Sequence, residues 1–137
     1  MKDACSVEYI DHVGIAVHDL EASLAFFREA FQLPTSEIVE MEEQGIRVTL
    51  IPVGQTRLEL LAPLSADSAV GRFLEQHGEG LHHLALNVEN VAESLEALGN
   101  RGLELVDKKP RQGFTGSIAF IHPRSVHGIL TELVQTP

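Results

Sequence analysis

An internal repeat is the feature that most constrains the fold of this 137-residue sequence. His83 follows His12 by 71 residues (83 − 12), and the same offset relates many other positions of the two halves. It pairs Val17 with Val88, Asp19 with Asn90, Ser23 with Ser94, Gly45 with Gly116 and Pro52 with Pro123. A second match, Glu59 with Glu132, has an offset of 73 (132 − 59), so two extra residues fall in the turn after Pro123, where insertions are tolerated. The repeat predicts two copies of one folding unit.

Each half has the pattern of a strand, a helix and three further strands. In the first half, alternating and helical periodicities predict a strand over 9–17, a helix that begins after Asp19, and strands over 36–42, 46–53 and 57–61. Asp19 is a typical N-cap residue. The Leu33-Pro34 pair is expected to end the helix.

The second half repeats this order. Its predicted elements are a strand over 81–88, a helix capped by Asn90 that ends near Gly99 or Gly102, and strands at 103–107, 116–121 and 129–134. We expect a single α+β domain over residues 1–137, with module one at about 8–62 and module two at about 80–135. A linker over 63–79 with a short helix at 68–77 is expected to join them.

Strand alternation predicts which way the repeated polar residues point. His12 shares a strand face with Gly14 and Ala16, and Glu59 points away from its leucine neighbours. A single histidine or glutamate on a strand is more often a surface or core group. Four at matched positions favour a different interpretation: if the two halves curve toward each other, His12, Glu59, His83 and Glu132 converge. Two imidazoles and one or two carboxylates suit a divalent ion with open positions for substrate.

The charge balance limits the partners of the chain. Ten Lys and Arg against twenty Asp and Glu give a net charge of −10, which argues against general affinity for nucleic acid or an anionic membrane. One cysteine, Cys5, cannot form an intrachain disulfide. No signal peptide or membrane-length apolar run is present. We therefore expect a cytoplasmic protein without nucleic-acid or membrane partners.

Several stretches of the chain resemble a known family. They are Ile10-Asp11-His12-Val13-Gly14-Ile15-Ala16-Val17, Glu42-Glu43-Gln44-Gly45-Ile46-Arg47, Leu58-Glu59-Leu60-Leu61-Ala62-Pro63, Gly78-Glu79-Gly80-Leu81-His82-His83 and His127-Gly128-Ile129-Leu130-Thr131-Glu132-Leu133. The βαβββ duplication with these residues is similar to the vicinal oxygen chelate (glyoxalase/bleomycin resistance/dioxygenase) superfamily. Within it, the chain resembles the methylmalonyl-CoA epimerases from Ile10 to Val134. The resemblance implies a curved mixed sheet of two βαβββ modules around a metal-binding cleft.

The resemblance also implies a metal site and a reaction. His12, His83 and Glu132 would be metal ligands, and Glu59 would complete the set. The sequence does not select the ion: cobalt is our first choice, and manganese, nickel or zinc also fit. The reaction would interconvert the (R) and (S) forms of methylmalonyl-CoA by proton abstraction and enolate stabilisation, and a homodimer is the expected assembly.

The catalytic bases are harder to assign. Some relatives have glutamine at the position of Glu59 and carry a catalytic carboxylate at the position that Val48 occupies here. Glu59 and Glu132 are therefore our first choice for the acid–base pair, and Glu43 and His127 are the alternatives. Coenzyme A brings phosphates, so we expect Arg47, Lys109, Arg111 and His127 to contact the substrate.

Three other functions remain open on the sequence. A lactoylglutathione lyase would use the same metal and proton-abstraction chemistry on a glutathione hemithioacetal. A ring-cleaving dioxygenase would need a redox-active iron. A non-catalytic small-molecule binding protein of the same fold would often lack the ligand histidines, so His12 and His83 argue against it.

Overall fold

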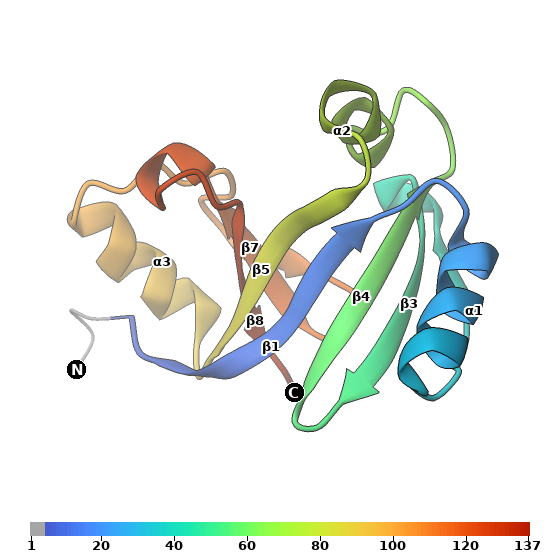
Figure 1. The fold of residues 1–137 in the computed structure, drawn as a ribbon. Helices are drawn as coiled ribbons and strands as arrows, with labels where there is room; N and C mark the ends of the chain where they lie inside the picture. Colours follow the sequence, from blue (N-terminus) through green and yellow to red (C-terminus); the bar gives the residue numbers. More distant parts are fainter. Residues whose placement is uncertain (1–4) are drawn as a thin grey trace. The chain divides into compact units, whose positions relative to one another are not determined.

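A computed structural model describes residues 5–137, which form two compact units (Figure 1). One unit comprises residues 12–82, and the other comprises residues 83–137 together with the described residues up to Asp11. The boundary crosses the two strands that carry the histidines, β1 (Val7–Ala16) and β5 (Gly80–Val88). The predicted module limits of 8–62 and 80–135 stay a prediction.

The unit of residues 12–82 contains a mixed sheet and two helices. Its elements after β1 are α1 (Leu20–Phe31), β2 (Val39–Met41), the 3-10 turn η1 (Glu42–Gln44), β3 (Ile46–Val53), β4 (Thr56–Pro63) and α2 (Ala69–His77). The strand order is β2-β3-β4-β1. The pairs β2–β3 and β3–β4 are antiparallel, whereas β4 is parallel to β1.

The other unit repeats this pattern. Its elements after β5 are α3 (Val91–Asn100), β6 (Arg111–Gln112), β7 (Ser117–Ile121), the 3-10 turn η2 (Pro123–Ser125) and β8 (Thr131–Gln135). The strand order is β5-β8-β7-β6, with β5 parallel to β8 and the remaining pairs antiparallel. In both units the histidine strand is thus parallel to the glutamate strand, as two βαβββ modules require.

The predicted helix caps are confirmed. The Asp19 side chain accepts a hydrogen bond of 3.0 Å from the backbone N–H of Ala22, and the Asn90 side chain accepts one of 2.9 Å from Glu93. Both satisfy backbone donors that the first helical turn leaves unpaired. The C-cap residue of α1 is Gln32, which adopts the left-handed conformation with φ of 58°, one residue before the predicted Leu33-Pro34 stop.

The predicted strand at 103–107 was wrong. Only Leu105 makes a β-bridge there, to Ile121, and the two-residue strand β6 takes the sheet edge instead. The backbone N–H groups of Val106 and Asp107 both donate to the same carbonyl of Phe120, which a regular ladder would not do. The segment therefore attaches to β7 as a loop, and its Asp107 side chain becomes available for other contacts.

Helices cover both faces of β4 in the unit of residues 12–82 (Figure 1). On one face, Leu60 and Ala62 pack with Leu20 of α1. On the other face, Leu61 packs with Val70 and Leu74 of α2. Glu59 alternates with Leu60, so its side chain shares the second face with Leu61.

In the other unit, α3 covers one face of the sheet. Val91 and Leu95 of this helix pack with Leu133 of β8. The opposite face has a smaller core of Ala85, Ile118, Val134 and Phe120. Glu132 belongs to this second face because it alternates with Leu133.

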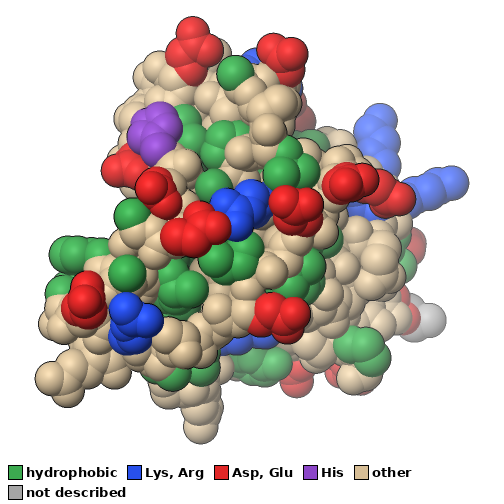
Figure 2. Space-filling view, turned by 90° about the vertical axis from the view of Figure 1, so that its right-hand side faces the viewer, with side chains coloured by type: hydrophobic (Ala, Val, Ile, Leu, Met, Phe, Trp, Pro, Cys, Tyr) green, Lys and Arg blue, Asp and Glu red, His purple; other side chains and the backbone are tan. Residues whose placement is uncertain are grey.

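Among the charged side chains on the surface that carries α1, Asp and Glu predominate (Figure 2). Asp and Glu side chains are spread over this face, hydrophobic side chains lie between them, and the Lys and Arg side chains that the structure describes there form no continuous basic patch. No helix in residues 5–137 is both long and apolar enough to span a membrane.

Candidate metal and acid–base site

The first predicted pair of ligands meets in the unit of residues 12–82. The Nε2 atom of His12 lies 3.6 Å from Oε1 of Glu59. The register places Gly14 directly opposite Glu59, and His12 lies two residues earlier on the same strand face. The two side chains are buried, with residue exposures of 4% and 7%.

The second pair meets in the other unit. The Nε2 atom of His83 lies 3.0 Å from Oε1 of Glu132, and both residues are buried. Ala85 is opposite Glu132 in the parallel β5–β8 register, as Gly14 is opposite Glu59. The small residue beside each carboxylate leaves room for the histidine two positions earlier.

The chemistry of these residues fits a divalent ion. Imidazole nitrogens and carboxylate oxygens are ligand atoms for such ions, and His12 and Glu59 in one unit, like His83 and Glu132 in the other, are buried. Burying ionisable groups is costly unless they are paired with each other or bind a metal. Each unit therefore places one imidazole and one carboxylate side by side in a largely water-excluded position.

Val48 lies on the glutamate-bearing face of its unit and is fully buried. It packs against Leu61 and against Val70 and Leu74 of α2. A carboxylate at this position would be surrounded by aliphatic groups. The surroundings of residue 48 therefore suit the valine that is present and do not suit a carboxylate.

The two alternative bases are in different surroundings. Glu43 belongs to the turn η1 and is exposed. His127 is also exposed and has a positive φ of 53°. Neither shares the burial of Glu59 and Glu132.

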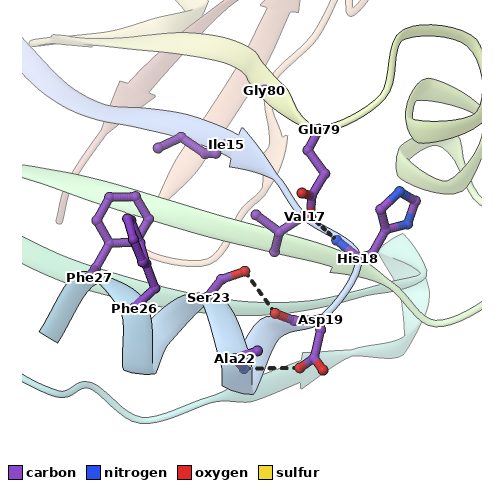
Figure 3. Close-up of a pocket in the computed structure, with 10 residues that line it drawn as sticks. All are labelled: Ile15, Val17, His18, Asp19, Ala22, Ser23, Phe26, Phe27, Glu79 and Gly80. Atoms are coloured by element: carbon purple, nitrogen blue, oxygen red, sulfur yellow. Dashed lines mark hydrogen bonds between the residues drawn. The ribbon is translucent and has the colours of Figure 1, made fainter. Parts of the chain in front are cut away.

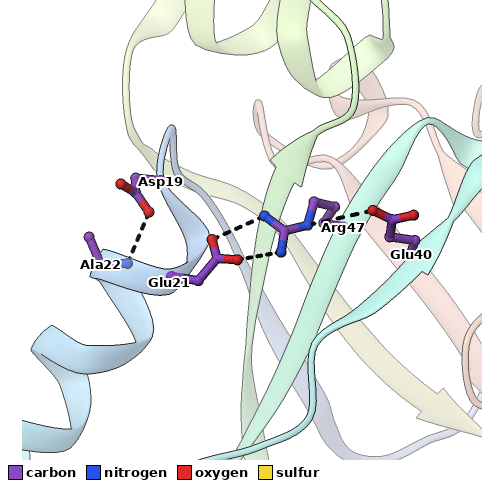
Figure 4. A network of polar contacts seen from close by, with 5 residues as sticks. All are labelled: Asp19, Glu21, Ala22, Glu40 and Arg47. Carbon is purple, nitrogen blue, oxygen red and sulfur yellow. Dashed lines mark hydrogen bonds and ion pairs between the residues drawn. The ribbon is translucent and has the colours of Figure 1, made fainter.

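Arg47 is held between two carboxylates (Figure 4). Its guanidinium donates hydrogen bonds of 3.0 and 2.5 Å to Glu21, and Glu40 lies 4.0 Å away. Hydrogen bonding from Arg47 lowers the pKa of the Glu21 carboxyl to about 2. As a substrate contact, Arg47 would have to exchange this partner for the ligand.

The remaining predicted substrate cations differ in how they are held. Lys109 is exposed in the loop before β6. Arg111 is fixed more firmly: its Nε donates to Asp107 at 3.1 Å, and its guanidinium carbon lies 5.4 Å from the centroid of the Phe120 ring. Sequence reasoning missed Asp107 and Phe120. Correct pairing of β7 with β8 would have revealed Phe120, because it lies directly opposite Glu132.

The other histidines have structural or surface positions. His82 makes an edge contact with Phe73, with ring centroids 4.8 Å apart. His18 and His77 are exposed near helix ends. His122 caps η2 by accepting a hydrogen bond of 3.0 Å from the backbone of Arg124.

A hollow of about 580 Å³ lies elsewhere in the unit of residues 12–82 (Figure 3). It is lined by Ile15 of β1 and Val17 just after it, by residues of α1 including Phe26 and Phe27, and by Glu79. Ile15 and Val17 alternate with Gly14 and Ala16, so they face away from the side of β1 that carries His12. This hollow is therefore not part of the His12–Glu59 pair.

Comparison with known proteins identifies the family. Residues 11–120 match the Glyoxalase/Bleomycin resistance protein/Dioxygenase superfamily. The chain is 41% identical over 127 residues to the uncharacterized protein YqjC of Bacillus subtilis, covering 92% of this chain and 91% of that protein. It is 34% identical over 128 residues to the mitochondrial methylmalonyl-CoA epimerase of Homo sapiens, covering 92% of this chain and 73% of that protein.

A solved structure shows the same fold. A methylmalonyl-CoA epimerase in complex with methylmalonyl-CoA and NH4+ superposes with a TM-score of 0.91 at 38% identity, over 96% of each chain. The glyoxalase-type α+β fold expected from the sequence is confirmed. The chain belongs to the methylmalonyl-CoA epimerase family of the glyoxalase/bleomycin resistance protein/dioxygenase superfamily.

Proposed function

We propose that this protein is a metal-dependent methylmalonyl-CoA epimerase. The observation that carries the proposal is the buried histidine–glutamate pair in each unit, at 3.6 and 3.0 Å, in a chain whose relatives are named for this activity. The two pairs occupy equivalent positions in the repeat, so one unit alone offers only half of a four-ligand set.

His12, Glu59, His83 and Glu132 would hold the ion, and cobalt is the ion we propose first, with manganese, nickel or zinc as alternatives. When bound, a divalent ion supplies Lewis-acid stabilisation of the negative charge that develops on the thioester oxygen. The histidines provide neutral donors. The two carboxylates bring the negative charge that balances the ion.

Glu59 and Glu132 would also move the proton. The hydrogen removed is on the carbon between the thioester carbonyl and the free carboxylate of the acyl group. Inversion needs one group that removes this proton from one face and a second that returns a proton to the other face. The two glutamates come from opposite halves of the repeat, and a carboxylate that binds an ion through one oxygen can move a proton through the other. The apolar surroundings of Val48 favour these residues over a base at position 48.

The substrate would be an acyl-CoA, which the predicted cations would help to bind. Arg111 is the strongest candidate because it stands beside the His83–Glu132 pair, separated from His83 by the Phe120 ring. Lys109 and His127 are exposed and would contact the coenzyme A portion, as would Arg47 after exchange of its Glu21 partner. We further propose that the protein works as a homodimer in the cytoplasm.

Metal reconstitution tests the proposed function. Protein stripped with a chelator should not invert (R)-methylmalonyl-CoA, and added cobalt should restore both inversion and exchange of solvent deuterium into the substrate. The His12→Ala and His83→Ala variants should bind less metal and remain inactive. Full inversion by metal-free protein, or a metal-loaded protein without turnover of this thioester, would refute the proposal.

A further inference from the structure

Asp107 uses both carboxylate oxygens to fix two neighbouring groups. One oxygen, Oδ2, accepts a hydrogen bond of 2.8 Å from the backbone N–H of Phe120, and the other accepts the 3.1 Å bond from Nε of Arg111. Only 18% of the Asp107 side chain is exposed. The loop before β6 is thereby tied to β7, and the arginine is held from one edge of its guanidinium.

The other edge of the Arg111 guanidinium is available to a ligand. Among the residues that the structure describes, no hydrogen bond to protein uses its two Nη groups, and 44% of the side chain is exposed. The guanidinium carbon lies 5.4 Å from the centroid of the Phe120 ring, which is within the range of a cation–π contact. A planar fork with free N–H donors, fixed at its base, is suited to bind a phosphate or carboxylate through two parallel hydrogen bonds.

Phe120 connects this arginine to the ligand pair. Its ring meets the His83 ring edge-on, with centroids 5.7 Å apart and an interplanar angle of 83°. It also lies opposite Glu132 in the β7–β8 register, so both side chains emerge from the same face of the sheet. Arg111 therefore lies one aromatic ring away from His83, on the face that carries the proposed chemistry.

We infer that Arg111 binds an oxyanion of the substrate, namely a phosphate of coenzyme A, and that Asp107 is its positioning residue. This inference rests on the proposed function, in which the substrate is an acyl-CoA that reacts beside His83 and Glu132. The Phe120 ring occupies the space next to His83, so the guanidinium meets a more distant part of the ligand. In a protein of net charge −10, a fixed local cation offsets the repulsion that coenzyme A phosphates would otherwise experience.

Truncated substrates test which oxyanion Arg111 binds. With methylmalonyl-CoA, the Arg111→Gln variant should raise KM by about tenfold, because a charge-assisted hydrogen bond is lost, and should leave kcat within about twofold. With the methylmalonyl thioester of pantetheine, which lacks the nucleotide phosphates, the variant should match the wild type. The KM of Arg111→Lys for methylmalonyl-CoA should lie between those of the wild type and Arg111→Gln, because lysine keeps the charge but lacks the forked guanidinium.

Equal losses with both thioesters would show that Arg111 contacts the acyl group or acts structurally, and would overturn the inference. The matched control is Arg124→Gln, which removes an arginine paired with Glu104 at 3.3 Å and should leave both KM values unchanged. Calorimetric binding of coenzyme A itself separates the two proposals. If the wild type binds coenzyme A and Arg111→Gln weakens that binding about tenfold, Arg111 has the inferred role even where the wild type fails to epimerise.

A double-mutant cycle tests the role of Asp107. Asp107→Asn should raise KM for methylmalonyl-CoA about threefold to fivefold on its own and add nothing to Arg111→Gln, because it acts through that arginine. The Glu104→Gln variant is the matched control and should leave KM unchanged. Additive losses from Asp107→Asn and Arg111→Gln, in variants whose thermal unfolding shows a folded protein, would exclude the positioning role.

Discussion

The two histidine–glutamate pairs share a backbone frame but differ in what surrounds them. In the unit of residues 12–82, Glu59 lies on a sheet face that also carries Leu61 and the aliphatic packing of α2, opposite Leu50 of β3. In the other unit, Glu132 lies opposite Phe120, whose ring contacts both His83 and Arg111. The repeat thus preserves the parallel pairing of histidine and glutamate strands, whereas the neighbouring side chains have diverged.

This difference suggests that the two halves contribute differently to the proposed site. Both halves have a buried imidazole beside a carboxylate, and both pairs belong to the proposed metal site. On the Glu132 side, Phe120 lies opposite the carboxylate and Arg111 is fixed over its ring, which are features suited to recognising a substrate. Four experiments can sharpen or break this comparison.

The largest expected effect is on the proton transfer itself. Glu59→Gln and Glu132→Gln should each lower the rate of epimerisation about 100- to 10,000-fold, the range for loss of an acid–base group. If the two carboxylates serve opposite faces, each variant should still exchange solvent deuterium into only one of the two epimers. Mass spectrometry of each pure epimer measures this. Identical exchange patterns in the two variants would show that the glutamates do not divide the faces between them.

A carboxylate at position 48 should destabilise the unit of residues 12–82. Val48→Glu buries an unpaired acid among Leu61, Val70 and Leu74, and we expect a loss of roughly 3 kcal/mol or more in the free energy of unfolding at neutral pH. Burial favours the protonated acid, so the loss should shrink as the pH falls. Val48→Ala is the control for lost packing, at about 2 kcal/mol. Chemical denaturation measures both, and a Val48→Glu protein as stable as the wild type would contradict the aliphatic environment described above.

The residues opposite the two carboxylates allow a matched comparison. Leu50→Ala and Phe120→Ala both shorten a partly buried side chain, and each should cost about 1 to 3 kcal/mol of stability. Only Phe120→Ala should also weaken binding of coenzyme A, because it removes the support of Arg111. Calorimetry with coenzyme A distinguishes the two, and similar binding losses in both variants would remove the proposed difference between the halves.

The smallest effect is expected at the Arg47–Glu21 pair on the surface. In the folded state, hydrogen bonding to Arg47 lowers the pKa of Glu21 to about 2. The ionised Glu21 therefore stabilises the fold at pH values above its ordinary pKa, and this stabilisation is lost as the pH falls toward 2. The difference in melting temperature between wild type and Glu21→Gln should therefore be small near neutral pH and vanish between about pH 4.5 and 2. Scanning calorimetry across this range measures it. A constant difference at all pH values would exclude the ion pair as its source.

The repeat explains why so much of the fold was predictable. Strand and helix periodicities are local features of the sequence, and the constant offset lets the elements predicted in one half be checked against those in the other. Asp19 and Asn90 were therefore predicted as helix caps, and the strands of His12 and His83 were placed within a few residues. The strand predicted at 103–107 failed because its alternating sequence is compatible with a strand, whereas hydrogen bonds from Val106 and Asp107 to one carbonyl of Phe120 hold it as a loop. Those bonds depend on a residue more than ten positions away.

The sequence by itself determined the duplicated βαβββ order, the residues that form each histidine–glutamate pair, and the family. These follow from residue identity and from spacing along the chain. The tertiary structure alone decided that Val48 is buried under α2, that Arg47 is already bound to Glu21, and that Asp107 fixes Arg111 over Phe120 beside His83. Such contacts join distant segments, and they depend on strand register and helix packing, which no local pattern in the sequence specifies.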